Sequence, residues 1–557
     1  GHQRHGAQGR TLREGASGTD YDRQWTDRIT DASHAAVRTA YRAACDDEKT
    51  GVTGMPLPFV ACLRYRIFKK RYKNDLHSPK KRYKIREKKL KKRHTKPTER
   101  PVLTRSFYNN LLKWKDNKNK KAMLVTGARQ IGKTSLIRRF GKEQYECFVE
   151  LNFIELPKAK GIFRAGRDVE SVIMGITALL GVSLIPGKTL IFFDEIQECP
   201  DARTAIKFLV EDGRFDYVES GSLLGVNSGE THSYPVGFEE IHRMYPMDLE
   251  EFALANGIPE DVLDHVRSSF EDRKPVSAGV HEALSRLFRL YVLTGGMPAV
   301  VQEFVSSHDI QKVVSQQRDI LGLYRLDIAK YAGREKTKVQ DIFDSIPSQL
   351  DDKNRRFMLA SINKAARYVR YEDSFVWLRD AGVTLPCYNV SEPVIPLRLN
   401  EQRTLFKLFM ADTGLLCAAG IDNIQFSILN GDLSINMGSL LENAFAQIFA
   451  ANGFKLWYFN KQKYGELDFV LQLGPKCLPV EIKSGKDYRR HAALNNILGV
   501  SEWKFDEAIV FCMDNVSTDG KVTYLPWYMS MFLKTPQPES YIVDADFSGL
   551  SACIPKS

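Results

Sequence analysis

The chain lacks several features that would place it outside the cytoplasm. It has no run of eighteen apolar residues, whereas a transmembrane helix needs about twenty. It has no basic segment followed by an apolar one at its start, so we expect no secretory signal. Its nine cysteines are scattered singly, without a C-x-x-C pair, which argues against a disulfide framework or a zinc site. We therefore expect a cytoplasmic protein with free thiols and no membrane segment.

An excess of positive charge is also missing from most of the sequence. The net charge of the 557 residues is +12, but residues 64–100 hold eighteen Lys and Arg against three acidic residues and alone carry +15. The rest of the chain therefore sums to −3. Four aromatic residues are interleaved with the basic ones in this segment. It is either a nucleic-acid arm with salt-dependent, sequence-independent affinity or a solvated tail.

The beginning of the chain shows little periodicity. Residues 1–63 are rich in Gly, Arg, Asp, Thr and Ser and do not start with Met, so we interpret them as disordered or as a non-native leader. Residues 64–101 form the basic low-complexity segment, and the ordered protein is expected to start near Val102. An apolar fraction of 43% supports substantial cores, and the length allows about two to four domains.

The clearest chemical motif lies in residues 121–136, K-A-M-L-V-T-G-A-R-Q-I-G-K-T-S-L. A short apolar run predicts a buried strand, and the next residues fit G-x-x-x-x-G-K-[ST]. The glycines let backbone N–H groups point at phosphate oxygens, and the following helix adds its positive end. Lys133 is expected to reach the β- and γ-phosphates of a nucleotide, and the Thr134 hydroxyl to hold Mg²⁺. The predicted nucleotide-binding residues are Gly127, Ala128, Arg129, Gln130, Ile131, Gly132, Lys133, Thr134 and Ser135.

A second strand is predicted at residues 189–195, T-L-I-F-F-D-E. Four apolar residues before two acids indicate a buried strand that ends at the ligand-binding edge of an open α/β sheet. Asp194 is expected to hold Mg²⁺, directly or through water, and Glu195 to polarise the attacking water. A further strand over 217–222 ends in small polar residues. Ser220 or Ser222 is a candidate γ-phosphate sensor there, although a plain strand end is an equal interpretation.

The middle of the chain is mainly helical. The segment 283–305 has helical spacing on both sides of G-G-M-P, which cannot continue a helix. Residues 338–381 contain three helical patterns, and an alternating segment at 383–399 suggests a β-wing. This order is that of a winged helix, whose third helix can enter a DNA major groove. The third pattern, 371–380, is not notably basic, so we favour a packing module over a DNA reader.

A second constellation lies in residues 438–483. A helix over 438–452 carries Glu442, and predicted strands follow at 454–459, 465–470 and 477–483. Asp468 with Glu481-x-Lys483 matches the phosphodiesterase core of restriction endonucleases. Two carboxylates hold Mg²⁺ against the scissile phosphate there, Glu442 completes the metal shell, and the lysine stabilises developing charge or activates water. The alternative is an endonuclease fold retained as a binding platform. Arg489, Arg490 and His491 are predicted on a helix that either meets a phosphate backbone or is a solvated face.

Three segments extend these motifs to a family resemblance. They are S-Y-P-V-G-F-E-E-I-H-R-M-Y-P-M-D-L-E-E-F at 233–252, Y-V-L-T-G-G-M-P-A-V-V at 291–301 and F-K-L-F-M-A-D-T-G-L-L at 406–416. With the phosphate loop, the chain resembles predicted prokaryotic AAA-type ATPases that carry a C-terminal domain of unknown function, from about Val102 to Phe532. The resemblance implies an ATP-binding domain, a helical or winged-helix middle and a restriction-endonuclease-like C-terminal domain. The expectation that the nucleotide carries adenine and not guanine rests on this resemblance, since no N-K-x-D element for reading the base is apparent.

We therefore expect an α/β protein with a P-loop NTPase domain at 102–255, a helical domain at 256–335, a winged-helix-like domain at 336–403 and a restriction-endonuclease-like domain at 404–557. The leading hypothesis is an ATPase that couples Mg-ATP hydrolysis to the nuclease-like domain, with DNA as a candidate substrate. The alternative is a nucleotide-dependent DNA- or protein-binding module without nuclease activity. Neither Arg243 nor Arg286 can be assigned as an arginine finger, and a homo-oligomer rests on analogy.

Overall fold

The computed structural model describes residues 103–164, 168–221, 235–351, 356–364, 366–420 and 437–536. The predictions for residues 1–101 and for Ser222 lie outside these ranges. In the described part of the chain, none of the helices has the length and apolar character needed to cross a membrane.

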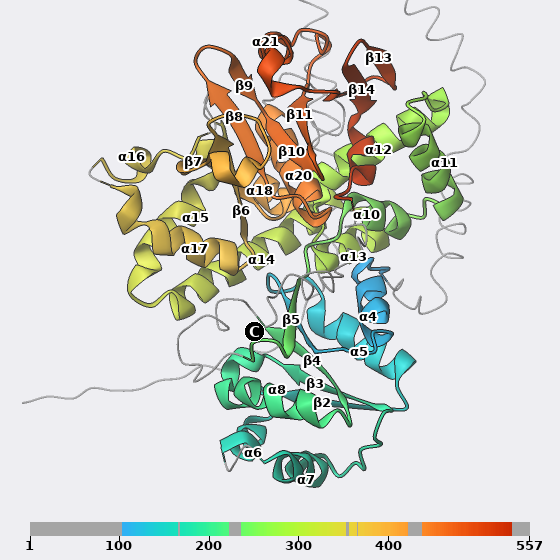
Figure 1. The fold of residues 1–557 in the computed structure, drawn as a ribbon, viewed down its shortest axis with the longest axis vertical. Helices are drawn as coiled ribbons and strands as arrows, with labels where there is room; N and C mark the ends of the chain where they lie inside the picture. The colour runs from blue at the N-terminus through green and yellow to red at the C-terminus, as the bar shows by residue number, and fades with distance from the viewer. Residues whose placement is uncertain are drawn as a thin grey trace, which may run out of the picture. The chain divides into compact units, whose positions relative to one another are not determined.

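The nucleotide-binding motif lies in a five-stranded parallel sheet with the order β2-β3-β4-β1-β5 (Figure 1). Strands β1 and β3 are buried at every position, which explains their continuous apolar sequences. Because β1 and β3 both run parallel to β4, which lies between them, the loops that follow β1 and β3 open on the same edge of the sheet. The strands are β1 (Ala122–Thr126), β2 (Cys147–Asn152), β3 (Thr189–Asp194), β4 (Asp216–Gly221) and β5 (Glu239–Arg243).

Helices cover both faces of this sheet. Alternate side chains of β1 point to opposite faces of the sheet. Met123 and Val125 belong to the hydrophobic core on the first face, and Leu124 belongs to the core on the second face. The first face packs against α4 (Phe107–Lys115) and α5 (Lys133–Gln144). The second face packs against α6 (Lys160–Arg164), α7 (Val169–Leu180) and α8 (Pro200–Asp212).

A helical region follows the sheet. As predicted, G-G-M-P interrupts it, because Gly295 has a positive φ of 71° and Pro298 occupies the first turn of the next helix. Gly296 tolerates no side chain, since a Cβ there would lie 2.0 Å from the Met247 carbonyl oxygen. The helices are α10 (Leu249–Ala255), α11 (Glu260–Glu271), α12 (Ala278–Thr294), α13 (Pro298–Ser307), α14 (Ile310–Tyr331), α15 (Lys336–Asp351), α16 (Leu359–Ile362) and α17 (Glu372–Asp380).

Of the predicted β-wing at 383–399, only residues 384–390 form a strand, and that strand is part of a larger sheet. Strand β6 (Thr384–Val390) pairs antiparallel with β7 (Glu401–Met410), as a wing would, but it also pairs parallel with β8 (Trp457–Lys461). The sheet order is β7-β6-β8-β9, with β9 at Gly465–Leu467. Because β6 is paired on both edges, it is not a free wing. The boundary predicted between residues 403 and 404 falls inside β7, so the two regions on either side of it share a sheet.

The C-terminal region contains a second mixed sheet, ordered β10-β11-β12-β14-β13. The predicted strand at 465–470 is two strands, because β9 pairs with β8 whereas β10 pairs with β11. The chain crosses between the sheets at Asp468. The elements are α18 (Thr413–Gly420), α20 (Met437–Ala451), β10 (Phe469–Leu473), β11 (Lys476–Ile482), α21 (Ala492–Leu498), β12 (Ala508–Cys512), β13 (Ser517–Asp519) and β14 (Val522–Pro526).

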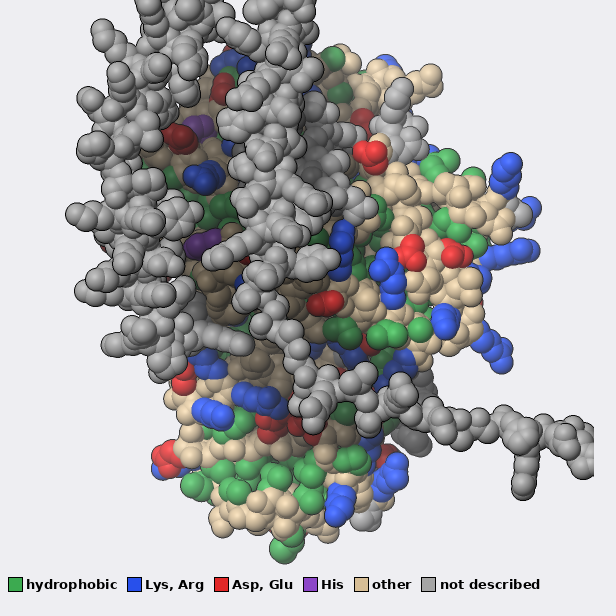
Figure 2. Space-filling view, turned by 180° about the vertical axis from the view of Figure 1, so that it is seen from behind, with side chains coloured by type: hydrophobic (Ala, Val, Ile, Leu, Met, Phe, Trp, Pro, Cys, Tyr) green, Lys and Arg blue, Asp and Glu red, His purple; other side chains and the backbone are tan. Residues whose placement is uncertain are grey.

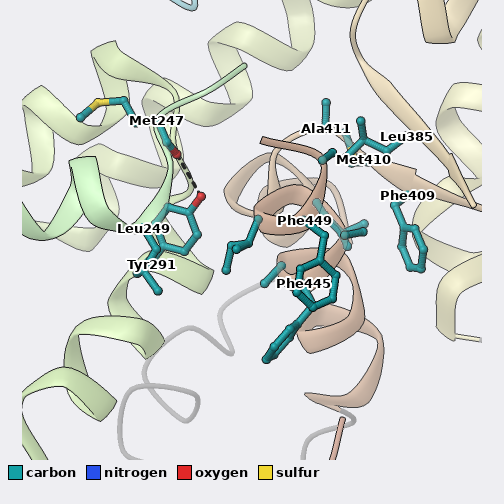
Figure 3. Close-up of a cluster of buried hydrophobic side chains, with 14 of the residues drawn as sticks. Met247, Leu249, Tyr291, Leu385, Phe409, Met410, Ala411, Phe445 and Phe449 are labelled. Atoms are coloured by element: carbon teal, nitrogen blue, oxygen red, sulfur yellow. Dashed lines mark hydrogen bonds between the residues drawn. The ribbon is translucent and has the colours of Figure 1, made fainter. Parts of the chain in front are cut away.

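One hydrophobic core connects the helical region to the C-terminal sheets. Figure 3 shows α20 carrying Phe445 and Phe449 between Tyr291 of α12 and the strand side chains near Phe409. The Phe445 ring lies 5.9 Å from Phe288, centroid to centroid. The Tyr291 hydroxyl donates to the Met247 carbonyl over 2.9 Å. The aromatic contacts therefore fix α12 against α20, and the Tyr291 hydrogen bond fixes α12 against the residues that precede α10.

A buried ion pair joins the start of the described chain to α10. Arg105 Nε donates to Glu251 Oε2 over 3.0 Å, and both side chains are at most 7% exposed. Glu251 also completes a capping box with Asp248, and Arg105 donates to the carbonyls of Ile131 and Tyr245 over 2.6 Å each. This pair holds the phosphate-loop backbone against the first helix of the helical region.

We expect Glu251→Ala to lower the free energy of unfolding by about 3–5 kcal/mol, because it leaves the buried Arg105 guanidinium without its carboxylate. Thermal and chemical unfolding of the full chain measure the loss. The matched control is Glu143→Ala, which breaks an exposed pair with Arg139 and should change stability by less than about 0.5 kcal/mol. Equal losses for the two variants would contradict this role of the buried pair.

Candidate functional site

The loop between β1 and α5 has the backbone of a phosphate cradle. Gly127 and Gly132 have φ of 144° and 89°, and Gln130 has a φ of 64°. A Cβ at Gly127 would lie 2.3 Å from the Met244 carbonyl oxygen, so no other residue fits there. The turn places the N-terminus of α5, which begins at Lys133, at the carboxyl edge of the sheet. Free N–H groups of a helix start face an anion at such a position.

Asp194 ends β3 on the same edge and is only 2% exposed. Its carboxylate accepts hydrogen bonds from Thr134 Oγ1 at 3.1 Å and from Asn152 Nδ2 at 2.9 Å, and also from the Ser220 hydroxyl. Burial raises the pKa of Asp194 above its usual range, although the Ser220 bond opposes the rise. Of the two sensor candidates, Ser220 therefore faces the predicted acid. Asn152 was not predicted; its position as the last residue of the apolar-alternating stretch C-F-V-E-L-N, which forms β2, is the signal that could have found it.

Glu195 and Lys133 line one cleft of about 520 Å³ beside the loop. Glu195 has a left-handed φ of 56° and accepts a hydrogen bond from Gln197 Nε2. The helical region contributes the opposite wall, which the sequence did not predict. The cleft is lined by Arg129, Gln130, Gly132, Lys133, Thr134, Ser135, Ile154, Glu195, Pro298, Leu323 and Tyr324.

The ammonium of Lys133 is held by its own loop. Lys133 Nζ donates to the carbonyls of Gly127 and Ala128 over 2.9 Å each. Burial lowers the pKa of Lys133 to about 8, against the opposing charges of Glu195 and Asp194. An anion in the cleft would offer this ammonium a charged acceptor in place of neutral carbonyls.

The residues at this edge fit a magnesium ion. Mg²⁺ takes oxygen ligands, one or two protein carboxylates and phosphate oxygens of the substrate. The Thr134 hydroxyl and the Asp194 carboxylate lie within hydrogen-bonding distance of each other and supply such oxygens. In the described ranges, no three His, Cys, Asp or Glu side chains gather into a metal cage. The donor set therefore suits an ion that also needs nucleotide oxygens.

The predicted nuclease-like residues fall into two groups. Asp468 Oδ2 accepts the Ile482 N–H over 2.8 Å, and Glu481 of β11 contacts Lys483. Burial, followed by the nearby Asp468 charge, raises the pKa of Glu481. Of its carboxylate oxygens, Oε2 is buried and has no hydrogen-bond partner among the described residues. Asp468, Glu481 and Lys483 are thus brought together, as the motif predicts.

Glu442 belongs to a different cluster. Lys407 Nζ lies 3.1 Å from Glu442 and 2.6 Å from Glu466, and the lysine is fully buried. The predicted shell of Glu442, Asp468 and Glu481 is therefore not a gathered group of three carboxylates in the described chain. The ammonium of Lys407 neutralises Glu442 instead. The sequence missed Lys407 because nothing in the local pattern of β7 marks it.

The predicted basic helix near residue 490 is shorter than expected. Helix α21 begins at Ala492, so Arg489, Arg490 and His491 precede it. His491 is only 6% exposed, and its ring nitrogen Nε2 bonds to the Tyr524 hydroxyl over 2.8 Å. The histidine is therefore a packing residue and is not available to a phosphate backbone.

Three family models match separate segments of the chain. Residues 119–253 match an AAA domain, residues 285–425 a "Domain of unknown function (DUF8612)" and residues 437–528 a "Domain of unknown function (DUF4143)". No curated protein matches the sequence. The phosphate loop and Asp194 thus lie inside a segment that is similar to an AAA domain. Two further segments of the chain are similar to domains of unknown function.

Solved structures with a similar arrangement are distant. A Walker-type ATPase of Pyrococcus abyssi is 14% identical, covers 58% of this chain and 98% of its own, and has a TM-score of 0.36. The Aeropyrum pernix Orc1 protein in complex with DNA is 15% identical over 60% and 95%, with a TM-score of 0.25. Thermotoga maritima RuvB is 16% identical over 50% and 87%, with a TM-score of 0.25. These likenesses are too weak to carry an argument about function.

We expect nucleotide binding to take up a proton above pH 8. Lys133 has a pKa of about 8 in the free protein, and a bound phosphate raises it because an opposite charge favours the ammonium. At a pH between the free and the nucleotide-bound pKa of Lys133, binding therefore protonates the Lys133 amine. The affinity for the nucleotide falls as the pH rises through that range. Calorimetry of Mg-ADP binding at pH 8.5, in buffers of different ionisation enthalpy, measures the uptake. Lys133→Arg is the control, since arginine stays charged; uptake that persists in it would contradict the assignment.

Proposed function

We propose that the protein binds Mg-ATP in the cleft beside the phosphate loop and hydrolyses it. The observation that carries the proposal is the convergence of Lys133, Thr134, Asp194 and Glu195 on one edge of the parallel sheet, around a cleft of about 520 Å³. That volume lies within the usual range for ligand pockets, about 300–1,000 Å³. The AAA-domain match over residues 119–253 supports the same chemistry.

Each residue has a role that its position permits. The backbone N–H groups of residues 127–134 receive the phosphates, and Lys133 exchanges its carbonyl partners for phosphate oxygens. Thr134 and Asp194 would hold Mg²⁺, which supplies charge neutralisation on the phosphates when bound. Glu195 accepts a proton from the attacking water, and Gln197 orients its carboxylate. Ser220 and Asn152 hold the Asp194 carboxylate beside the Thr134 hydroxyl.

The test separates binding from turnover. We expect Lys133→Ala to lose affinity for Mg-ADP and Mg-ATP, and Glu195→Gln to bind both while kcat falls by about 10²–10⁴-fold. Calorimetry and phosphate release measure these effects, with melting temperature as the check on folding. Lys142→Ala, an exposed change on the same helix α5, is the matched control. Normal hydrolysis by Lys133→Ala would refute the proposal.

A second candidate function is Mg²⁺-dependent phosphodiester cleavage in the C-terminal region. The observation that favours it is the contact group of Asp468, Glu481 and Lys483, in which one buried oxygen of Glu481 has no hydrogen-bond partner among the described residues. An unpaired buried acceptor costs free energy that a cation would recover. Two carboxylates, without Glu442, would then hold the ion.

This candidate predicts nicking of DNA that requires Mg²⁺ and falls to background in Asp468→Ala. Lys483→Ala should lose the activity to a similar extent, because it removes the charge that stabilises the transition state. Asp506→Ala is a control, since its pair with Lys476 is exposed. Gel analysis of supercoiled plasmid, with and without ATP, measures the activity. Undiminished nicking in both variants would exclude this site as its source.

The alternative to both activities is a nucleotide-dependent binding module. On the part of the described surface that is visible in Figure 2, Lys and Arg side chains are interspersed with Asp and Glu. Helix α17, for which we favoured a packing role over DNA reading, contacts the parallel-sheet region, where Arg243 donates to the Arg379 carbonyl over 2.9 Å.

A further inference from the structure

The third residue of the phosphate loop is bound by a helix of another region. Arg129 Nη1 lies 2.8 Å from Asp327 Oδ1, and its second terminal nitrogen donates to the Tyr331 hydroxyl over 3.3 Å. The guanidinium also lies over the Tyr331 ring, 5.5 Å from its centroid. The Arg129 carbonyl accepts the Tyr324 hydroxyl over 3.2 Å. Both the backbone and the side chain of Arg129 are therefore tied to α14.

The three partners form a single face of α14. Tyr324, Asp327 and Tyr331 are spaced by three and four residues, which places them one above another along a helix. Behind them, a small cavity is bounded by Trp377, Ala381 and Val383. Gly382 has a φ of 77°, and a Cβ there would lie 2.7 Å from the Ala128 nitrogen. The loop is thus enclosed on this side.

Arg129 also lines the nucleotide cleft, together with Lys133 and Glu195. Its side chain is 40% exposed, whereas Asp327 is 19% exposed. Burial raises the pKa of Asp327. The positive charge of Arg129 lowers it in part, and the negative charge of Glu195 raises it further. Asp327 is therefore a poorly solvated and imperfectly stabilised partner for the guanidinium. A phosphate with two or more free oxygens is a stronger one, because it accepts two parallel N–H bonds from arginine.

We propose that Arg129 binds the γ-phosphate of the nucleotide and that this contact competes with the Asp327 and Tyr331 contacts on α14. Arg129 is then a positioning residue that transfers the phosphate state of the site to α14. With a diphosphate bound, Arg129 holds α14; with a triphosphate bound, it releases the helix. The inference rests on the proposed ATP binding and names the residue that distinguishes ATP from ADP.

Movement of α14 would reach the C-terminal region through buried polar contacts. Gln317 of α14 is fully buried and donates to the carbonyls of Leu293 and Thr294 at the end of α12. Gly414 of α18 packs so closely that a Cβ would lie 2.6 Å from the Gln317 amide nitrogen. Close packing leaves no slack, so a shift of α14 displaces α18 as well.

The experiment compares the affinities of the full chain for Mg-ADP and for the Mg-bound β,γ-imido analogue of ATP by calorimetry. We expect Arg129→Ala to weaken the affinity for the analogue by about tenfold to a hundredfold, which is the contribution of hydrogen bonds between charged groups. The affinity for ADP should fall by less than about twofold. Asp327→Asn removes the competitor, so the analogue should bind as tightly as to the wild type or more tightly. Arg129→Lys should recover part of the loss.

The matched control is Arg139→Ala, which breaks the exposed pair with Glu143 on α5 and should change neither affinity. A second readout is amide hydrogen exchange in residues 318–331. In the wild type, exchange should be faster with the analogue than with ADP, and in Arg129→Ala the two should be equal. This readout reports on α14 even where an affinity change is small.

An equal loss of affinity for both nucleotides in Arg129→Ala would overturn the inference. Arg129 would then only stabilise the loop, whichever nucleotide is bound. Weakening of the analogue by Asp327→Asn would overturn it too, because the pair would then assist binding. These outcomes differ from failure of the proposed function, in which the wild-type protein binds neither nucleotide and Lys133→Ala changes nothing.

Discussion

The burial of the Asp194 carboxylate is the constraint around which the parallel-sheet region is arranged. An ionised carboxylate that is 2% exposed has lost most of its hydration and must recover that free energy from hydrogen bonds. Its three donors come from the first turn of α5, from the end of β2 and from the end of β4. Only a parallel sheet with β3 between β2 and β4 brings these element ends together. The strand order is therefore what provides the buried Asp194 carboxylate with its hydrogen-bond donors.

The cleft depends on the helical region for its second wall, and buried polar groups hold that wall in place. Asp412 accepts the Gly296 N–H over 2.6 Å and the Leu415 N–H over 3.0 Å. Gln447 of α20 donates to the Tyr291 hydroxyl over 2.9 Å. Burial raises the pKa of Asp412 to about 6. Groups of this kind are directional, so they fix the loop before Pro298 in one position, whereas apolar packing alone would tolerate sliding.

The sequence predicted those parts of the site whose signals are local. The glycine spacing before Lys133 and the apolar run before Asp194 are read within about fifteen residues, and both elements form where expected. The limits of helix α7 are set by local signals of the same kind, since Asp168 caps it and Gly181 ends it. The wall formed by Leu323 and Tyr324 could not be predicted, because nothing near residue 130 indicates which distant helix will face it.

The errors in the C-terminal region have a related cause. From the local sequence alone, extended segments after a set of helices resemble the wing of a winged helix. Strands β6 and β7 do form an antiparallel pair. The pairing of β6 with β8 joins residues almost seventy positions apart (Tyr388 with Trp457), and this non-local contact decides the fold. Lys407 is another case. Its direct neighbour across the β6–β7 ladder is Cys387, and its two acidic partners lie on α20 and β9, so no periodicity marks it.

The same lysine changes the chemistry open to the C-terminal region. A fully buried ammonium between Glu442 and Glu466 satisfies the carboxylate that would have completed a metal shell, and removing one partner from such a pair is costly. What remains is Asp468 beside Glu481, two carboxylates whose repulsion and burial both raise the pKa of Glu481. Lys483 offsets part of that repulsion. A divalent cation would offset the rest, whereas a protonated Glu481 would do so without one. Binding of a divalent cation beside Asp468 and Glu481 is thus the property that would separate a metal-dependent enzyme from a binding platform built on the same strands.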